Sequence, residues 1–198
     1  MSHLCNANQD TFWPRLKWPD FAAMLKQERV VVILPVAGFA DWGNNLPLDW
    51  EEQVAMEILK RASQQLHPAV PHLVLPPQRY VTGSRETAAF TMKPDEVYDA
   101  ISEIIESVKA SGFRKVVFYN SSPWNEDLLE TIARDLRVDF GMQTFCINLS
   151  GLGIDLSEPQ TEVQSEDAAA KLASLLGEVA SKPGLANDGV IPRKGDAE

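Results

Sequence analysis

The sequence predicts an α/β protein with three layers, in which helices cover both faces of a mostly parallel sheet. Several short, nearly continuous apolar segments are typical of strands that are buried on both faces. The stretches between them show the three- and four-residue periodicity of helices that pack on a sheet. This alternation of strand and helix favours a parallel sheet, whose ligands bind beyond the carboxyl ends of the strands.

The elements follow one another in a regular order. They are a helix from residue 18 that ends before 30, a strand at 30–34, a helix at 49–66, a strand at 72–75, a helix at 94–111, a strand at 115–119, a helix at 125–138, a strand at 144–149 and a helix at 166–180. Pro35 is expected to close the first strand. Asp49 and Glu52 form a capping-box-like pair at the start of the second helix.

Length and composition indicate one domain. A chain of 198 residues with 44% hydrophobic content can bury a core without disulfides or metals. We expect the domain to span residues 1–182, with a polar leader at 1–16, and residues 183–198 to form a flexible or docking tail. The two cysteines, Cys5 and Cys146, show no metal-ligand spacing, which favours a reducing compartment and predicts a cytoplasmic protein.

Charge and hydropathy exclude two classes of partner. The formal net charge is -10 and no cluster of Lys and Arg occurs, which argues against nucleic acid, because its binders need a basic face. No apolar run approaches the ~20 residues that span a bilayer, and the N-terminus lacks the pattern of a signal peptide. We expect neither nucleic acid nor a membrane as a partner.

The loop after the first strand carries the most informative motif. Residues 34–51 read LPVAGFADWGNNLPLDWE. This stretch resembles the first metal motif of the creatininase (creatinine amidohydrolase) family, roughly L-P-V-G-S-T-E-Q-H-G-P-H-L-P-L-G-T-D, which supplies a Glu, a His and an Asp to a pair of divalent metals. Those three positions fall here on Ala40, Trp42 and Glu51.

Other segments extend the resemblance over about residues 17 to 180 and imply a creatininase-like fold. The family's L-P-P-x-x-Y matches Leu75-Pro76-Pro77 with Tyr80, and its G-F-R-x-I-V matches residues 112–117. The second metal motif, N-G-H-x-x-N, corresponds to residues 120–125, NSSPWN. There Ser122 replaces the His, and Trp124 stands where some members hold a ligand Glu. The late H-A-G-E-x-E-T-S segment is absent.

These departures bear on the cofactor. The family uses zinc or manganese, and a dinuclear site needs several carboxylate and imidazole ligands that converge on the metals. Glu51 alone cannot supply them, and the three histidines lie outside the motif loops. The sequence therefore predicts no metal cofactor.

Polar and aromatic side chains remain concentrated on the loops at the carboxyl ends of the strands. Asp41 and Glu51 are candidates for acid and base chemistry. The candidate ligand-binding residues are Trp42, Asn45, Arg79, Tyr80, Arg85, Asn120, Ser122 and Trp124. The two arginines could hold a carboxylate, or they could form Arg–Glu pairs in a solvated loop. Structural roles are the alternatives: the tryptophans fill the former metal cavity, Asp41 forms a turn, and Asn125 or Ser122 caps a helix.

The leading hypothesis is a creatininase-like protein that has lost the dinuclear metal site and acts as a non-catalytic or ligand-binding subunit. The resemblance implies an oligomer, often a hexamer in the family, formed with itself or with an active paralogue, and a small polar ligand. An alternative is an enzyme that acts on a small cyclic amide or sugar-like substrate through Asp41 and Glu51 without a metal. Residual single-metal binding by the same two carboxylates is a third possibility.

Overall fold

The computed structural model describes residues 10–27, 29–43, 45–67, 69–83, 88 and 90–183. Its strands are β1 Val31–Ala37, β2 His72–Val74, β3 Gln78–Arg79, β4 Lys115–Asn120 and β5 Gln143–Asn148. The sheet has the order β2-β1-β4-β5, and β3 also pairs with β1. All of these strand pairs are parallel. The predicted α/β class with a parallel sheet is confirmed.

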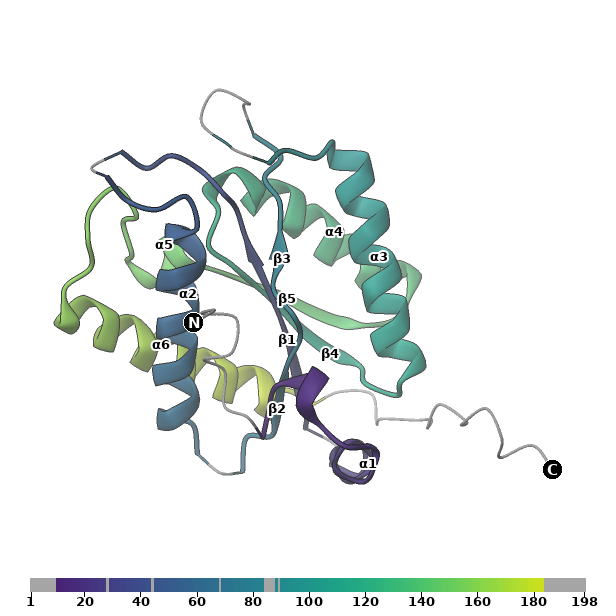
Figure 1. Cartoon of the computed structure of the whole chain (residues 1–198). Coiled ribbons are helices and arrows are strands. Elements are labelled where there is room, and N and C mark those ends of the chain that lie inside the picture. The colour runs from purple at the N-terminus through teal and green to yellow at the C-terminus, as the bar shows by residue number, and fades with distance from the viewer. Residues whose placement is uncertain are drawn as a thin grey trace.

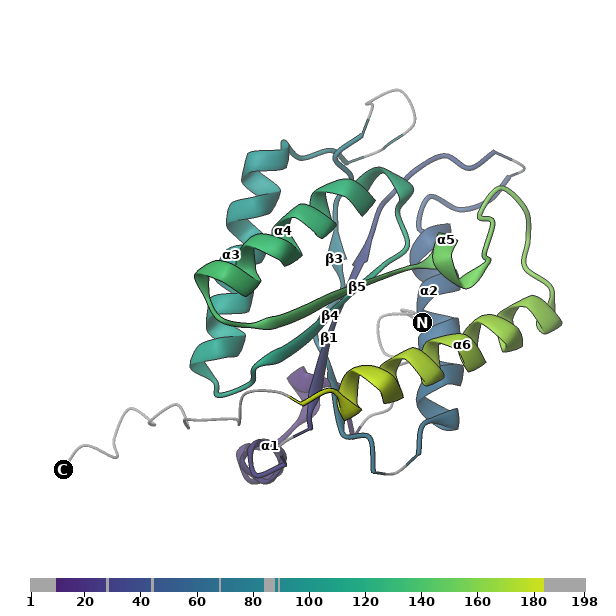
Figure 2. The same ribbon diagram turned by 180° about the vertical axis from the view of Figure 1, so that it is seen from behind.

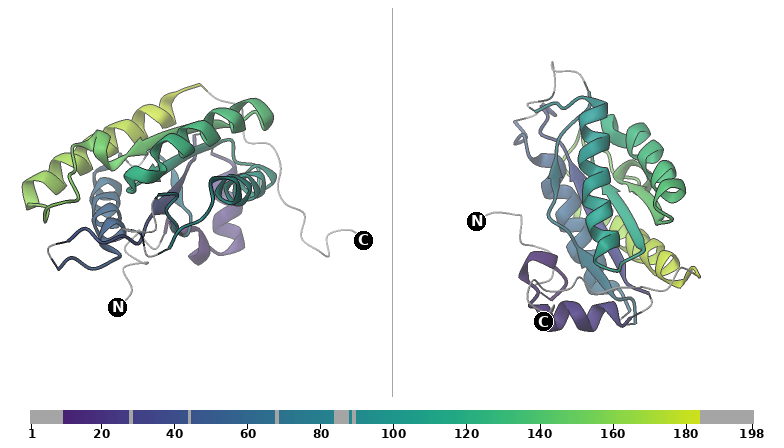
Figure 3. Two further views of the ribbon diagram at one scale, coloured as in Figure 1. Left: turned by 90° about the horizontal axis from the view of Figure 1, so that it is seen from above. Right: turned by 90° about the vertical axis from the view of Figure 1, so that its right-hand side faces the viewer.

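Helices cover both faces of this sheet. They are α1 Trp18–Leu25, α2 Trp50–Gln65, α3 Pro94–Ala110, α4 Glu126–Asp139, α5 Leu149–Leu152 and α6 Glu162–Ser181, with short 3-10 turns at Trp13–Arg15 and Pro123–Asn125. In Figure 1, α2 and α6 lie on one side of the strands and α3 and α4 on the other. The strands run between these two groups when viewed from above (Figure 3).

Two hydrophobic cores follow from the alternation of side chains along β1. Val31 and Ile33 pack in the core formed with α2 and α6. Val32 and Leu34 pack in the opposite core, with α1, α3 and α4. Successive side chains of a strand point to opposite faces, so a continuous apolar run fills both cores. The uninterrupted burial of β1 confirms the interpretation of its sequence.

The expectation that Pro35 closes the first strand is wrong, because β1 continues to Ala37. Leu75 N donates to Ile33 O, and Tyr80 N donates to Ala37 O, so the odd-numbered residues of β1 face β2 and β3. Pro35 has the same parity and lies at the gap between β2 and β3. Its missing N–H therefore leaves no ladder hydrogen bond unmade.

The last helix begins earlier than residue 166. Thr161 Oγ1 accepts a hydrogen bond from Gln164 N, and Thr161 N donates to Gln164 Oε1. This capping box starts α6 at Glu162. The T-x-x-Q signal was present in the sequence, but it precedes the apolar periodicity on which the prediction relied.

The described part of the leader packs against the domain. Val74 N donates to Thr11 O, and the Trp13 ring lies 4.7 Å from Phe21 and 5.4 Å from Phe113 between ring centroids. The predicted tail lies outside the described residues, except for Pro183. Among the described helices, none is long and apolar enough to cross a bilayer.

Candidate functional site

The loops that follow β1, β3 and β4 meet at the carboxyl end of the sheet. Ser121 N donates to Val36 O, which joins the ends of β4 and β1. Thr82 N donates to Asn125 Oδ1 at 3.0 Å, which joins the loop after β3 to the turn after β4. Parallel strands bring their carboxyl-end loops together at one edge, and the first turn of α2 lies beside them.

Glu51 is the most buried carboxylate of this region. Its side chain is 0% exposed, and each oxygen accepts a hydrogen bond from an uncharged donor. Gly38 N donates to Oε2 at 2.9 Å, and Trp42 Nε1 donates to Oε1 at 3.1 Å. Burial raises the pKa of Glu51 above its ordinary value of 4.5, and the N–H groups of Gly38 and Trp42 and the nearby Ser122 hydroxyl oppose part of that rise.

The Ser122 hydroxyl, in contrast, lacks a well-formed hydrogen bond. It is buried and makes no hydrogen bond of ordinary distance and angle to any described residue. It nevertheless lies near enough to the Glu51 carboxyl to lower its pKa. Ser122 therefore belongs to the Glu51 site, with a hydroxyl that is free to turn toward another partner.

The two tryptophans contact each other. The ring centroids of Trp42 and Trp124 are 5.4 Å apart, and the ring planes are tilted by 46°. The backbone of Gly83 lies against Trp124, since a Cβ added to Gly83 would stand 2.6 Å from Trp124 Cδ1. This packing favours the alternative in which the two rings fill the former metal cavity. It is less suited to two separate walls between which a ligand would stack.

Asn120 and Asn125 organise the turn after β4. Asn120 Nδ2 donates to Ser122 O at 2.8 Å and to Asn148 Oδ1 at 3.0 Å. Asn125 Nδ2 donates to Tyr80 O at 2.9 Å. Neither Asn125 nor Ser122 makes a side-chain cap hydrogen bond, so the helix-capping alternative is wrong. The amide of Asn125 instead ties the turn to the loop after β3.

Arg79 is already paired. Its Nε and Nη2 bind the two carboxylate oxygens of Glu52 at 2.5 and 2.8 Å. The predicted capping box of Asp49 and Glu52 is therefore wrong, because Glu52 is used by Arg79 and Asp49 accepts from Gln53 Nε2. Because these two N–H groups already bind Glu52, they cannot hold the carboxylate of a ligand in the same bidentate way.

The remaining candidates divide by burial. Tyr80 is buried, and its hydroxyl has no hydrogen-bond partner among the described residues. Burial raises the pKa of this hydroxyl. Asp41 and Asn45 are exposed. Asp41 Oδ1 accepts from Gly43 N at 2.8 Å, which makes it the turn former that the structural alternative expected. Arg85 lies outside the described residues.

The chain matches the creatininase family, described as creatinine amidohydrolase, over residues 14–180. This chain belongs to the creatininase family. The match covers the span of the resemblance and so confirms the family assignment made from the loop motifs. A search of curated proteins gives no significant match.

Solved creatininase structures share the fold. A putative creatinine amidohydrolase from Bacteroides fragilis aligns with a TM-score of 0.68 and 13% identity, over 89% of this chain and 98% of its own. A creatinine amidohydrolase (creatininase) gives a TM-score of 0.58 and 17% identity, over 73% of this chain and 60% of its own. A structure described as creatininase Mn gives 0.57 and 18% over the same shares. At these identities the likeness shows the fold alone.

The donor set of this creatininase-family chain does not fit a dinuclear metal centre. Across the described residues, no group of three or more His, Cys, Asp and Glu side chains converges on one point. The two motif positions at Trp42 and Trp124 offer an indole N–H, which donates and has no lone pair for a metal. Both oxygens of Glu51 already accept N–H groups.

Two contributors to the site were missed in the sequence. Gly38 supplies a backbone N–H to Glu51, and a Cβ there would stand 2.2 Å from Val81 Cγ2. Thr82 joins the site through its hydrogen bonds to Asn125 and to Trp124 O. A glycine directly after a buried strand signals a close backbone approach, whereas Thr82 is one of several polar residues in its loop and was not singled out.

Proposed function

We propose that this creatininase-family protein acts as a non-catalytic or ligand-binding subunit that no longer carries a dinuclear metal site. The hydrogen bond between Trp42 and Glu51 supports this most directly. Both residues stand where the family motif supplies metal ligands. A metal ligand offers a lone pair, whereas the Trp42 indole offers a hydrogen. The two positions therefore satisfy each other instead of a cation.

The proposal includes partners and a compartment. We expect assembly as a homo-oligomer or with an active paralogue, and a small polar ligand, in the cytoplasm. Among the described residues, Ser122 and Tyr80 are the best candidates to contact such a ligand, because their buried hydroxyls make no hydrogen bond of ordinary geometry to the described residues. An unsatisfied buried hydroxyl costs on the order of 1–3 kcal/mol, which a ligand or an ordered water would recover.

The test is elemental analysis of protein purified without chelator or metal-affinity resin. We expect zinc and manganese far below one equivalent. A second protein carrying Ala40→Glu, Trp42→His, Glu51→Asp and Ser122→His restores the ligand types of the two motifs and should gain zinc, with folding checked by circular dichroism. Stoichiometric metal in the wild type that disappears in Glu51→Gln would overturn the proposal.

A metal-independent enzyme is the second candidate. Burial raises the pKa of Glu51, and a carboxyl with a raised pKa is suited to act as a general acid. The base would be Asp41, which would have to leave its hydrogen bond to Gly43. A substrate would also have to part the tryptophan pair, because Glu51 has no exposed surface.

Turnover of small cyclic amides in the presence of chelator decides this alternative. Wild-type protein should act on at least one such substrate, and Glu51→Gln should abolish turnover while the circular dichroism spectrum stays unchanged. Equal activity in the two proteins would remove Glu51 from any mechanism.

A further inference from the structure

A groove lies along β5 on the side of the sheet that α6 covers. In Figure 2, β5 runs between α4 and α6 and leads directly into α5. Strand β5 forms the floor of the groove, and α5 and α6 form its walls. Its volume is about 330 Å³, at the small end of the range that is typical of ligand pockets. None of its lining residues is a candidate residue of the Glu51 site.

The middle of the groove is apolar. Phe145 and Ile147 line it from β5, Leu152 lines it from α5, and Leu175 and Val179 line it from α6. Leu175 is 37% exposed, so part of this apolar surface is in contact with water. A ligand with an apolar body would cover that surface and displace the water, which is favourable.

The groove has two distinct ends because α6 runs antiparallel to β5. Gln143 Nε2, at the start of the strand, donates to Pro183 O, just beyond the end of the helix. From Lys182 back to Leu175 the chain covers about 10 Å along the groove. Lys182 therefore stands at the end where β5 begins, above Phe145.

Positive charge gathers at this end. Lys182 Nζ lies 4.8 Å from the centroid of the Phe145 ring, and it forms no ion pair with a described carboxylate. Lys115 Nζ donates to Lys182 O at 3.0 Å. Burial lowers the pKa of Lys115, and the charges of Arg29 and Lys182 lower it further. Glu178 is the only carboxylate among the described lining residues, so cations outnumber it here and favour an anion.

The opposite end of the groove disfavours an anion. Ser150 Oγ donates to Glu126 Oε1 at 2.6 Å, so this hydroxyl already binds a carboxylate of the chain itself. A second carboxylate beside Glu126 would be repelled. The two ends therefore give the groove a direction, with the preferred place for a negative group at Lys182 and not at Ser150.

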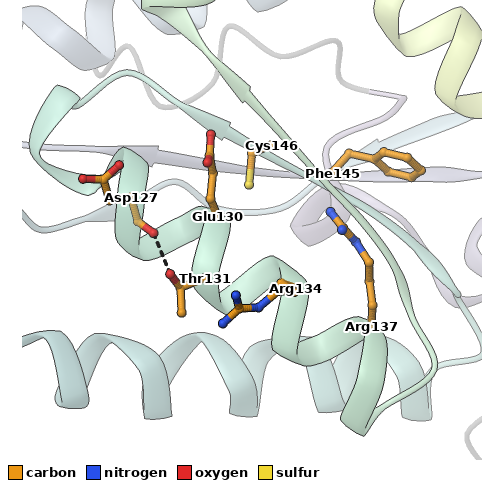
Figure 4. Close-up of a pocket in the computed structure, with 7 residues that line it drawn as sticks. All are labelled: Asp127, Glu130, Thr131, Arg134, Arg137, Phe145 and Cys146. Atoms are coloured by element: carbon orange, nitrogen blue, oxygen red, sulfur yellow. Dashed lines mark hydrogen bonds between the residues drawn. The ribbon is translucent and has the colours of Figure 1, made fainter.

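The groove on the other side of β5, beside α4, lacks this direction (Figure 4). Its charged lining residues are two acids and two arginines, Asp127, Glu130, Arg134 and Arg137. Arg137 Nε is already bound, since it donates to Thr144 O at 2.9 Å. These charges balance, so the groove beside α4 has no comparable preference for an anion.

We propose that the groove beside α6 is a binding site for a small carboxylate with an unbranched apolar tail. The carboxylate lies at Lys182, and the tail lies over Ile147 and against Leu175, along the groove length of about 10 Å. This site is separate from the Glu51 loops. It therefore adds a second ligand to the proposed function and does not depend on the first.

Isothermal titration calorimetry with octanoate and with octanol tests the assignment. The two probes have tails of the same length, but only octanoate carries a charge. We expect octanoate to bind saturably with a dissociation constant below about 1 mM at low salt. Octanol should bind roughly 10-fold more weakly, because it makes no charge-assisted hydrogen bond to Lys182.

Lys182→Gln and Glu178→Gln are a matched pair of exposed changes near the same helix end with opposite expected effects. Lys182→Gln should raise the dissociation constant of octanoate roughly 10-fold and leave that of octanol unchanged. Glu178→Gln removes an opposing charge and should lower the constant of octanoate roughly 2-fold. A general disturbance of the helix end would weaken binding in both variants.

Two further variants locate the site. Leu175→Asp places a charge on the apolar wall and should abolish octanoate binding, with an unchanged circular dichroism spectrum. Lys60→Gln removes a charge from an exposed side chain of α2 outside the groove, and it should leave the dissociation constant of octanoate unchanged.

Three outcomes would overturn the proposal. The first is that octanoate shows no saturable binding up to about 10 mM. The second is that octanoate and octanol bind equally well, or that Lys182→Gln changes neither constant, since the carboxylate is then not recognised at Lys182. The third is that octanoate binding survives Leu175→Asp, because the ligand then lies elsewhere. Elemental analysis still tests the loss of the metal site in each case.

Discussion

Glu51 and Glu52 are neighbours on α2, and both are buried, but they meet opposite kinds of partner. Glu52 is 4% exposed and binds the guanidinium of Arg79 through both oxygens. Glu51 is 0% exposed and meets uncharged groups, which are the N–H groups of Gly38 and Trp42 and the nearby Ser122 hydroxyl. Successive helical residues point about 100° apart, so one faces β3 and the other faces the loop after β1.

This difference shows which of the two buried carboxylates is stabilised in its charged form. A buried carboxylate needs a cation, hydrogen-bond donors or a proton, because desolvation penalises its charged form. Glu52 has the cation and forms a structural cross-link between α2 and β3. Glu51 has donors only, and burial raises its pKa. The former ligand position is therefore the less stabilised of the two, which makes it the better candidate for a polar ligand.

Arg79→Met should have the largest effect on this comparison. It leaves the Glu52 carboxylate buried without a cation, and breaking a buried pair from one side costs about 3–5 kcal/mol. The Arg79 side chain is 32% exposed, so we expect a loss near the lower end, about 3 kcal/mol of unfolding free energy in urea denaturation. Adding Glu52→Leu should return most of it. A loss under about 1 kcal/mol would show that the pair is mainly solvent-screened.

Gly38→Ala should follow. The new Cβ would stand 2.2 Å from Val81 Cγ2 and 3.1 Å from Glu51 Oε2, so the loop must move away from the carboxylate. Overpacking of this kind costs about 1–3 kcal/mol. Gly177→Ala in α6 is the matched control, because nothing lies within 4 Å of the added Cβ. It should stabilise the helix by about 0.5–1 kcal/mol, and equal losses for both would contradict the close approach at Gly38.

Trp42→Phe should cost about 1–2 kcal/mol, because it keeps a ring against Trp124 but removes the N–H donor to Glu51 Oε1. The same measurement on Trp124→Phe is the control, since the Glu51 hydrogen bonds remain. The pKa of Glu51 should rise further only in Trp42→Phe. Identical stability in both variants would mean that the indole hydrogen bond contributes nothing.

Glu51→Gln should give the smallest change and alter chiefly the pH dependence. The pKa of Glu51 is raised in the folded state, so the native protein holds this proton more tightly than the unfolded chain. Its contribution to stability is complete below about pH 4.5 and is lost as pH rises through the folded pKa. Wild-type stability relative to Glu51→Gln should therefore fall from acid to neutral pH. A constant difference would contradict the raised pKa.

Local signals were sufficient for most of the fold. The buried runs that became β1 and β4, and the periodic faces of α2, α3 and α4, depend on residue type alone. The order of the loop motifs also led to the family without any geometry. Local signals that are compatible with two different structures led to wrong predictions. Pro35 ends a strand unless it lies at a gap between its neighbours, and Glu52 caps a helix unless a cation reaches it first.

The site could be predicted only in part. Its loops were located correctly because parallel strands end at one edge. The motif alignment identified Glu51 as a site residue, and its side chain is buried among these loops at 0% exposure. The donors that Glu51 meets were not foreseen, because Gly38 and Trp42 reach it across a loop whose path the sequence does not specify. Arg79 was a candidate either to hold a ligand carboxylate or to pair with a glutamate, and the register of β3 on β1 places it on Glu52.

Sequence by itself determined the α/β class, the order of strands and helices, the family and the replacement of motif ligands, because these depend on local residue type and motif order. Tertiary structure alone decided that Trp42 donates a hydrogen bond to Glu51 and that Arg79 pairs with Glu52. Those outcomes depend on strand order and register, which bring together side chains that are distant in the chain, and no local pattern encodes those distances.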